Sequence, residues 1–222
     1  MLIKKLIKYF FNKLKNKKIL AYLKWLKDNM LESILRIKPP PPPHFIKENT
    51  VKKYTKKYGI NIFIETGTYY GDMINAVKHL FKNIFSIELD RILYEKSKER
   101  FKNYNKIFII NGDSSKVLPE ILKNINEPIV FWLDAHYSGD ITAKGDCETP
   151  IIQELEAIFK NYIEGSIILI DDARLFIGKN DYPTIDVIEE FVKLKEFKLN
   201  LIVNNDIIII LMERQLNLTG EK

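Results

Sequence analysis

The sequence has little cysteine and little histidine: one cysteine and three histidines in 222 residues. A single cysteine, Cys147, excludes a disulfide framework and fits a reducing compartment such as the cytoplasm. Three histidines and one cysteine are too few for a zinc cluster of the usual type. The chain is therefore expected to fold around an apolar core, for which its 46% of apolar residues suffices.

Long apolar runs are also missing. Lysines interrupt every apolar stretch of residues 1–38, so none approaches the roughly 20 apolar residues of a membrane span. No apolar core of a secretory signal follows the first charges either. The spacing instead predicts basic amphipathic helices. Three roles stay open for them: binding an anionic membrane surface, packing on the same domain or on a second copy in a homo-oligomer, or a frayed tail.

Charge and proline divide the chain. Residues 1–38 hold 11 Lys or Arg and 2 Asp or Glu, whereas the remaining residues hold 24 and 27. The body is mildly acidic, so no nucleic-acid partner is expected. Pro39 to Pro43 is an unbroken proline run, which predicts a stiff spacer. We therefore expect a basic helical segment at 1–38, a polyproline linker at 39–43 and one further domain at 44–222.

Apolar strand patterns and helical patterns alternate beyond residue 44. The expected strands are 60–65, 83–88, 106–110, 128–134, 166–171, 197–203 and 206–212, with helices at 46–58, 72–81, 91–104, 115–125, 150–162 and 183–195. Such alternation predicts a mostly parallel sheet covered on both faces. Asn204-Asn205 reads as a hairpin turn, so one terminal strand runs antiparallel. The predicted fold is a seven-stranded, Rossmann-like α/β domain.

The stretch Glu65-Thr-Gly-Thr-Tyr-Tyr-Gly71 follows the first expected strand. Glycines let a ligand approach the backbone, and the helix expected from Asp72 supplies free N–H groups. Together they predict a ligand site at the carboxyl end of the strand. Tyr69 stands where a dinucleotide fingerprint needs its second glycine, which disfavours a dinucleotide. A tight turn without a ligand is the alternative.

Acids end the successive strands, and in an open α/β sheet these ends line one crevice. They are Glu65, Glu88, Asp113, Asp134, Asp171 and Asp172. Glu88 lies 23 residues after Glu65, about where a nucleoside site places the carboxylate that binds ribose hydroxyls. Asp113 is a candidate adenine contact. The alternatives are a surface acid at Glu88 and a turn-forming acid at Asp113.

With these motifs, residues 60–212 resemble class I S-adenosylmethionine-dependent methyltransferases. Glu65-Thr-Gly-Thr-Tyr-Tyr-Gly71 looks like the first motif of the metal-dependent O-methyltransferases of the catechol and caffeoyl type, in which an aromatic residue replaces the middle glycine. Phe131-Trp-Leu-Asp134 looks like their fourth-strand motif, and Ile167-Ile-Leu-Ile-Asp171-Asp172 like their fifth. The resemblance implies a methyltransferase domain at 44–222.

The resemblance also implies a site. It assigns the S-adenosylmethionine donor to Glu65, Thr66, Gly67, Thr68, Tyr69, Gly71, Glu88, Asp113, Ser114 and Asp134. It assigns Mg²⁺ or another divalent ion to Asp134, Asp171 and Asp172. The family's lysine, three residues after the fourth-strand aspartate, is replaced by Tyr137. His136 is then the available general base beside Asp134, or else a residue next to the metal.

The acceptor is less well defined. The polar loop 135–149 indicates a hydroxyl-rich acceptor, a small molecule or a sugar or glycan. Similar chains are often attributed to cell-surface polysaccharide biosynthesis, which suits a cytoplasmic protein held peripherally at a membrane by residues 1–38. The alternatives are a non-catalytic binding or scaffold module, another Rossmann-like enzyme with a nucleotide cofactor, and a nucleic-acid methyltransferase.

Overall fold

The computed structural model describes residues 17–35, 41–135, 149–194 and 199–213. The chain divides into two compact units, residues 1–49 and 50–222. In the first unit, helix α2 (Lys17–Leu35) is one of the helices expected within residues 1–38. Within the described ranges, no helix has both the length and the apolar character needed to cross a membrane. The boundaries expected at residues 38 and 43 stay a prediction.

The second unit is built on one seven-stranded sheet in the order β3-β2-β1-β4-β5-β7-β6. The strands are β1 (Ile62–Thr66), β2 (Asn83–Glu88), β3 (Ile107–Asn111), β4 (Ile129–Leu133), β5 (Ile167–Ile170), β6 (Leu199–Asn204) and β7 (Ile207–Met212). The first five run parallel, whereas β7 is antiparallel to both of its neighbours. The predicted sheet and its terminal hairpin are therefore confirmed.

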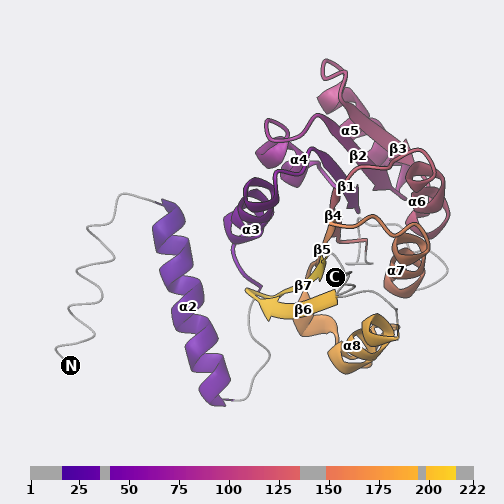
Figure 1. Cartoon of the computed structure of the whole chain (residues 1–222). Helices are drawn as coiled ribbons and strands as arrows, with labels where there is room; N and C mark the ends of the chain where they lie inside the picture. The colour runs from indigo at the N-terminus through magenta and orange to yellow at the C-terminus, as the bar shows by residue number, and fades with distance from the viewer. Residues whose placement is uncertain (1–16, 36–40, 136–148, 195–198, 214–222) are drawn as a thin grey trace, which may run out of the picture. The chain divides into compact units, whose positions relative to one another are not determined.

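The order of the strands locates the crevice. From β1 the chain moves outward to β2 and β3, then returns to β4 on the other side of β1 and continues to β5. Figure 1 shows β1 and β4 side by side in the middle of the sheet. In open α/β sheets, ligands bind outside the carboxyl ends of strands at such a reversal.

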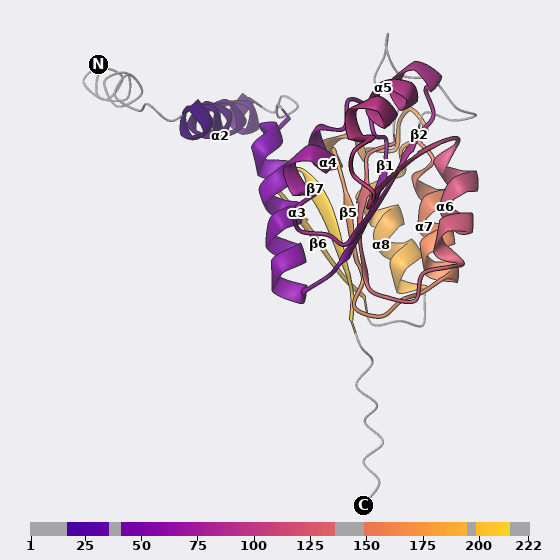
Figure 2. The ribbon, with the colours of Figure 1, turned by 90° about the horizontal axis from the view of Figure 1, so that it is seen from above.

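Helices cover both faces of this sheet. They are α3 (His44–Tyr58), α4 (Asp72–Val77), α5 (Arg91–Phe101), α6 (Ser114–Leu122), α7 (Ile151–Lys160) and α8 (Ile185–Lys193). Figure 2 shows α4, α5 and α3 on one face and α6, α7 and α8 on the other. Two apolar clusters result, because successive strand residues point to opposite faces. Phe63 and Trp132 pack on the α4 side, whereas Ile64 and Phe131 pack against α6 and α7. Both faces are buried, so the parallel strands read as continuous apolar runs.

One local expectation was wrong by one residue. The hairpin turn is Asn205–Asp206, with φ of 52° and 63°, and not Asn204-Asn205. Asn and Asp tolerate this left-handed region, and the Asp206 carboxylate accepts a hydrogen bond from the Arg174 backbone N–H at 2.7 Å, which holds the turn in place. Helix α4 begins at Asp72 as expected and ends at Val77, with Gly71 as its N-cap at φ of 76°.

Candidate functional site

The glycine turn after β1 packs directly on the end of β4. Gly67 has φ of 81°, and a Cβ atom there would lie 2.5 Å from the Asp134 carbonyl oxygen. The Asp134 N–H donates to the Thr66 carbonyl at 3.0 Å. Only glycine fits this close approach of two backbones. The turn thus brings two of the predicted site segments, 65–71 and Asp134, into contact.

Glu88, at the end of β2, joins the turn to the next loop. Its Oε2 accepts from the Tyr69 backbone N–H at 2.7 Å, and its Oε1 accepts from the Asp90 N–H at 2.9 Å. Tyr69 has φ of 50°, and its carbonyl accepts from the Ser97 hydroxyl. Glu88 is buried and is not the surface acid that the alternative interpretation required. Each of its oxygens keeps a lone pair for a further donor.

Glu65 lies deeper, at the end of β1. Its Oε2 accepts from the Ser86 hydroxyl at 2.6 Å, and Ser86 also bonds to the Thr68 hydroxyl at 2.6 Å. Burial raises the pKa of Glu65 well above its usual value, the Ser86 bond lowers it, and the charges of Asp134, Glu88 and Asp72 raise it further. Burial likewise raises the pKa of Glu88, against the backbone hydrogen bonds from Asp90, Tyr69 and Leu89, which lower it.

These shifts describe the electrostatics of the crevice. Carboxyl groups whose pKa is raised by burial and by each other are destabilised in their ionised form. A cation placed among them would relieve both effects, because opposite charge favours ionisation of an acid. The carboxyl ends of β1 and β2 therefore gather acids whose ionised form a positively charged ligand would stabilise.

Asp113 and Ser114 begin helix α6. Asp113 is its N-cap, and its carboxylate accepts from the Ser115 N–H at 2.9 Å and from the Lys116 ammonium at 3.2 Å. Burial acts to raise the pKa of Asp113, but the hydrogen bonds from Ser115 and Lys116 outweigh it and lower the pKa. Asp113 thus caps α6, since an N-cap satisfies free N–H groups of the first turn, and the adenine contact considered for it stays a prediction.

A positively charged side chain, Arg174, lies just after the end of β5. The Asp172 Oδ1 accepts from Arg174 Nη1 at 2.8 Å, and the same Nη1 is bonded to Asp206 in the hairpin turn. Burial works to lower the pKa of the Arg174 guanidinium, but the two aspartates outweigh it and raise the pKa. The Asp171 Oδ1 accepts from the Asp172 N–H at 2.8 Å. Sequence reasoning missed Arg174 and Asp206, which only the hairpin brings together.

This arrangement bears on the predicted metal centre of Asp134, Asp171 and Asp172. The Asp172 carboxylate is paired with the Arg174 guanidinium, and the metal site at these three aspartates stays a prediction. Among the residues the structure describes, no group of three or more His, Cys, Asp or Glu side chains is placed to hold a metal. His136, the predicted base, lies outside the described residues.

One further buried acid was not foreseen. Glu154 in α7 is 1% exposed, and the Ser114 and Thr66 hydroxyls and the charges of Asp113 and Asp134 all act on its carboxyl. The sequence did contain a signal, because helical spacing from Ile151 places position 154 on the face that also carries the buried Leu155.

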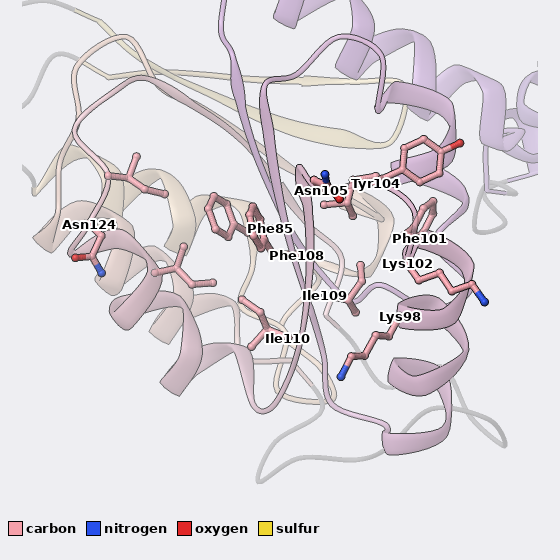
Figure 3. Close-up of a pocket in the computed structure, with 13 residues that line it drawn as sticks. Phe85, Lys98, Phe101, Lys102, Tyr104, Asn105, Phe108, Ile109, Ile110 and Asn124 are labelled. Carbon is pink, nitrogen blue, oxygen red and sulfur yellow. The ribbon is translucent and has the colours of Figure 1, made fainter.

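A pocket of about 650 Å³ lies elsewhere, at the outer edge strand β3. Figure 3 shows Phe85 and Phe108 together on its wall and Lys98 reaching in from α5. None of the predicted site residues lines it, so it is separate from the crevice at the strand ends.

Known proteins provide an independent comparison. No family model matches the sequence. "Ribosomal RNA small subunit methyltransferase A" of Caldanaerobacter subterraneus subsp. tengcongensis is 25% identical over 163 residues, which cover 69% of this chain. This chain spans only 58% of the length of that curated relative.

Solved structures match a larger share of this chain, at lower sequence identity. A Staphylococcus aureus protein assigned as a caffeoyl-CoA O-methyltransferase has a TM-score of 0.57 at 12% identity, over 96% of this chain and 100% of its own. The O-methyltransferase TomG of Streptomyces achromogenes, solved in complex with S-adenosylmethionine, has a TM-score of 0.58 at 13% identity, over 95% and 96%. With its seven strands and terminal hairpin, residues 50–222 have the Rossmann-like fold of the class I S-adenosylmethionine-dependent methyltransferases.

Proposed function

We propose that this protein is an S-adenosylmethionine-dependent O-methyltransferase. The observation that carries the proposal is the pair of buried acids, Glu65 and Glu88, around a glycine turn at the carboxyl ends of β1 and β2. S-adenosylmethionine is a cation at its sulfonium and at its amino group, and so matches the charge that this crevice favours. An NAD-type cofactor is disfavoured by Tyr69, which stands where a dinucleotide fingerprint needs its second glycine.

The donor site would use backbone as well as side chains. In this proposal the turn at Gly67 and Tyr69 leaves room for close approach, while Glu88 accepts hydrogen bonds from hydroxyls with its remaining lone pairs. The proposed donor-binding set remains Glu65, Thr66, Gly67, Thr68, Tyr69, Gly71, Glu88, Asp113, Ser114 and Asp134. The bound donor supplies an activated methyl group, and the protein supplies alignment with the acceptor.

The acceptor would be a hydroxyl of a small molecule, sugar or glycan bound beyond the ends of β4 and β5. Its proton must be removed for the oxygen to attack the methyl carbon. We assign that step to His136 beside Asp134, because an imidazole titrates near neutral pH. His136→Ala should lower the rate by roughly 10²- to 10⁴-fold if it is the base.

A divalent ion stays in the proposal. Asp134, Asp171 and Asp172 would supply its carboxylate ligands, and Asp172 is paired with Arg174 as well. Such an ion would lower the pKa of the acceptor hydroxyl. We expect chelation with EDTA to stop turnover and leave donor binding intact. Full turnover in excess EDTA would show that the reaction needs no metal. The acids would then act as hydrogen-bonding groups for the acceptor.

A ribosomal RNA acceptor is the second candidate, favoured by the rRNA methyltransferase relative. The charge of the chain disfavours an RNA acceptor, because RNA-binding proteins need basic side chains to neutralise phosphates. Beyond residue 38, acidic residues outnumber basic ones, 27 to 24. Incubation with labelled donor and either rRNA or a panel of hydroxylated small molecules and sugars separates the two. Label transfer to the small molecules supports the proposal, and transfer to rRNA alone would overturn it.

Residues 1–38 would hold the protein peripherally at an anionic membrane surface, since they carry 11 basic and 2 acidic residues. The full chain should bind vesicles containing anionic lipid and be released at high salt. A chain lacking residues 1–43 should stay folded and fail to bind. Equal vesicle binding by both chains would contradict this role.

A further inference from the structure

Two successive residues of β2 hold the glycine turn that follows β1. The Ile87 carbonyl accepts from the backbone N–H groups of Gly67 and Thr68, at 2.9 Å and 3.3 Å. Ser86 adds a contact between side chains, because its hydroxyl oxygen lies 2.6 Å from the hydroxyl oxygen of Thr68. The conformation of the turn therefore depends on β2 through a side chain as well as through the backbone.

The same serine also reaches the acid at the end of β1. Ser86 and Glu65 are paired in the parallel register of β1 and β2, and the Ser86 hydroxyl donates to Glu65 Oε2 at 2.6 Å. A hydroxyl has one proton to donate, so Thr68 is the donor in the bond between the two hydroxyls when Glu65 is ionised. The three side chains form one hydrogen-bond chain that runs from Thr68 through Ser86 to Glu65.

All three side chains of this chain are buried. Ser86 is 0% exposed, Glu65 2% and Thr68 3%. Hydrogen bonds to an ionised carboxylate are among the strong ones, and bonds linked in a chain strengthen one another away from water. Since Ser86 itself is out of reach of a ligand, it can act on one only through its two neighbours.

We propose that Ser86 is a positioning residue of the donor site, whose hydroxyl ties the Glu65 carboxylate to the Thr68 hydroxyl and so fixes the acid and the turn relative to each other. The inference rests on the proposed function, because the two groups matter to the donor only if it binds at this turn. A serine that only satisfies a buried carboxylate makes a different prediction. Its loss would lower stability and leave donor affinity unchanged.

The test is calorimetric titration of the full chain with S-adenosylmethionine, together with thermal unfolding of each variant. Ser86→Ala removes both bonds of the serine and should bind the donor about 10-fold more weakly. Ser86→Thr keeps the hydroxyl and should bind within about threefold of wild type. Ser166→Ala is the matched control and should bind as wild type, even if it is less stable.

Ser166 suits this purpose because it resembles Ser86 in burial but not in place. It is 1% exposed, and its hydroxyl accepts from the Ile129 N–H at 3.1 Å. Ile129 begins β4 and Ser166 immediately precedes β5, so both lie at the edge of the sheet opposite the crevice. A loss of donor affinity in Ser86→Ala alone therefore separates positioning from a general effect of removing a buried hydroxyl.

A double substitution tests whether the three side chains act as one chain. Thr68→Val keeps the size of the side chain without the hydroxyl, and it breaks the same chain at its other bond. The double variant of Ser86→Ala and Thr68→Val should therefore bind within about threefold of the weaker single variant. Losses of affinity that multiply in the double variant would show that the two residues act independently, which overturns the chain.

The remaining outcomes are distinct. If wild type binds no donor, the proposed function fails, whatever Ser86 does. If wild type binds and Ser86→Ala binds equally well, or if a folded Ser86→Thr is as weak as Ser86→Ala, the positioning role is overturned. Should the added methyl group keep Ser86→Thr from folding, Ser86→Cys replaces it. Its thiol is a weak donor, so its donor affinity should fall between those of wild type and Ser86→Ala, and an affinity no better than that of Ser86→Ala would contradict the role.

Discussion

Replacing Glu88 by glutamine tests the centre of the proposed donor site. Glu88 accepts two backbone hydrogen bonds, from Tyr69 at 2.7 Å and from Asp90 at 2.9 Å, one on each carboxylate oxygen. In Glu88→Gln one oxygen becomes an NH₂ group, which cannot accept. One backbone N–H then faces a donor, and the site also loses the negative charge that favours a cation.

The magnitude follows from the burial of this group, which is 6% exposed. A buried donor left without its partner costs about 1–3 kcal/mol. For a chain of this size that lowers the melting temperature by about 2–12 °C. If the donor binds at Glu88, its affinity falls by a comparable free energy, or about 5- to 160-fold.

Thermal unfolding and calorimetric donor titration measure the two effects separately. Glu95→Gln is the matched control, because Glu95 pairs with Arg91 at 2.8 Å but both side chains are more than half exposed. It should change stability by less than about 1 kcal/mol and leave donor affinity unchanged. A Glu88→Gln protein with wild-type stability and wild-type donor affinity would refute the role assigned to Glu88.

Three more substitutions test the structure around the site. Gly67→Ala should lower the free energy of unfolding by about 2–5 kcal/mol in urea titrations, because its Cβ would lie 2.5 Å from the Asp134 carbonyl at a left-handed φ; unchanged stability would contradict the close approach. Arg174→Met should cost about 3 kcal/mol, also read in urea, because the buried Asp172 and the half-buried Asp206 lose the guanidinium that pairs with them. Burial raises the pKa of Glu154 from 4.5 to about 7, so the folded state binds its proton more tightly than the unfolded state. Wild type should therefore lose about 3 kcal/mol relative to Glu154→Gln as pH rises from 4.5 to 7, and parallel pH profiles would refute this.

The fold was predictable because its signals are local. Strands such as Ile129–Leu133 are apolar on both faces and are separated by helical periods, which together specify a parallel sheet with two helical layers. The terminal hairpin could be predicted because a short polar turn separates the last two apolar strands. The turn was placed one residue early because Asn204, Asn205 and Asp206 all suit a left-handed backbone, and only contact with Arg174 selects the last two.

The site was predictable in part. Acids at strand ends could be expected to meet, because parallel strands end at one edge of the sheet. The partners of each acid could not be read in the same way. Arg174 pairs with both Asp172 and Asp206, although 32 residues separate Arg174 from Asp206, and the second pairing depends on how the hairpin returns beside β5. Glu88 holds the Tyr69 turn through a backbone N–H, which no sequence pattern encodes.

The central claim, that the crevice at the ends of β1 and β2 binds a cationic methyl donor, is tested most directly by calorimetric titration of the full chain with S-adenosylmethionine and, separately, with NAD⁺. The account predicts saturable binding of S-adenosylmethionine with one site per chain, weakened in Glu88→Gln, and no binding of NAD⁺. Binding of NAD⁺ in preference to S-adenosylmethionine, or no binding of S-adenosylmethionine by a folded chain, would contradict it.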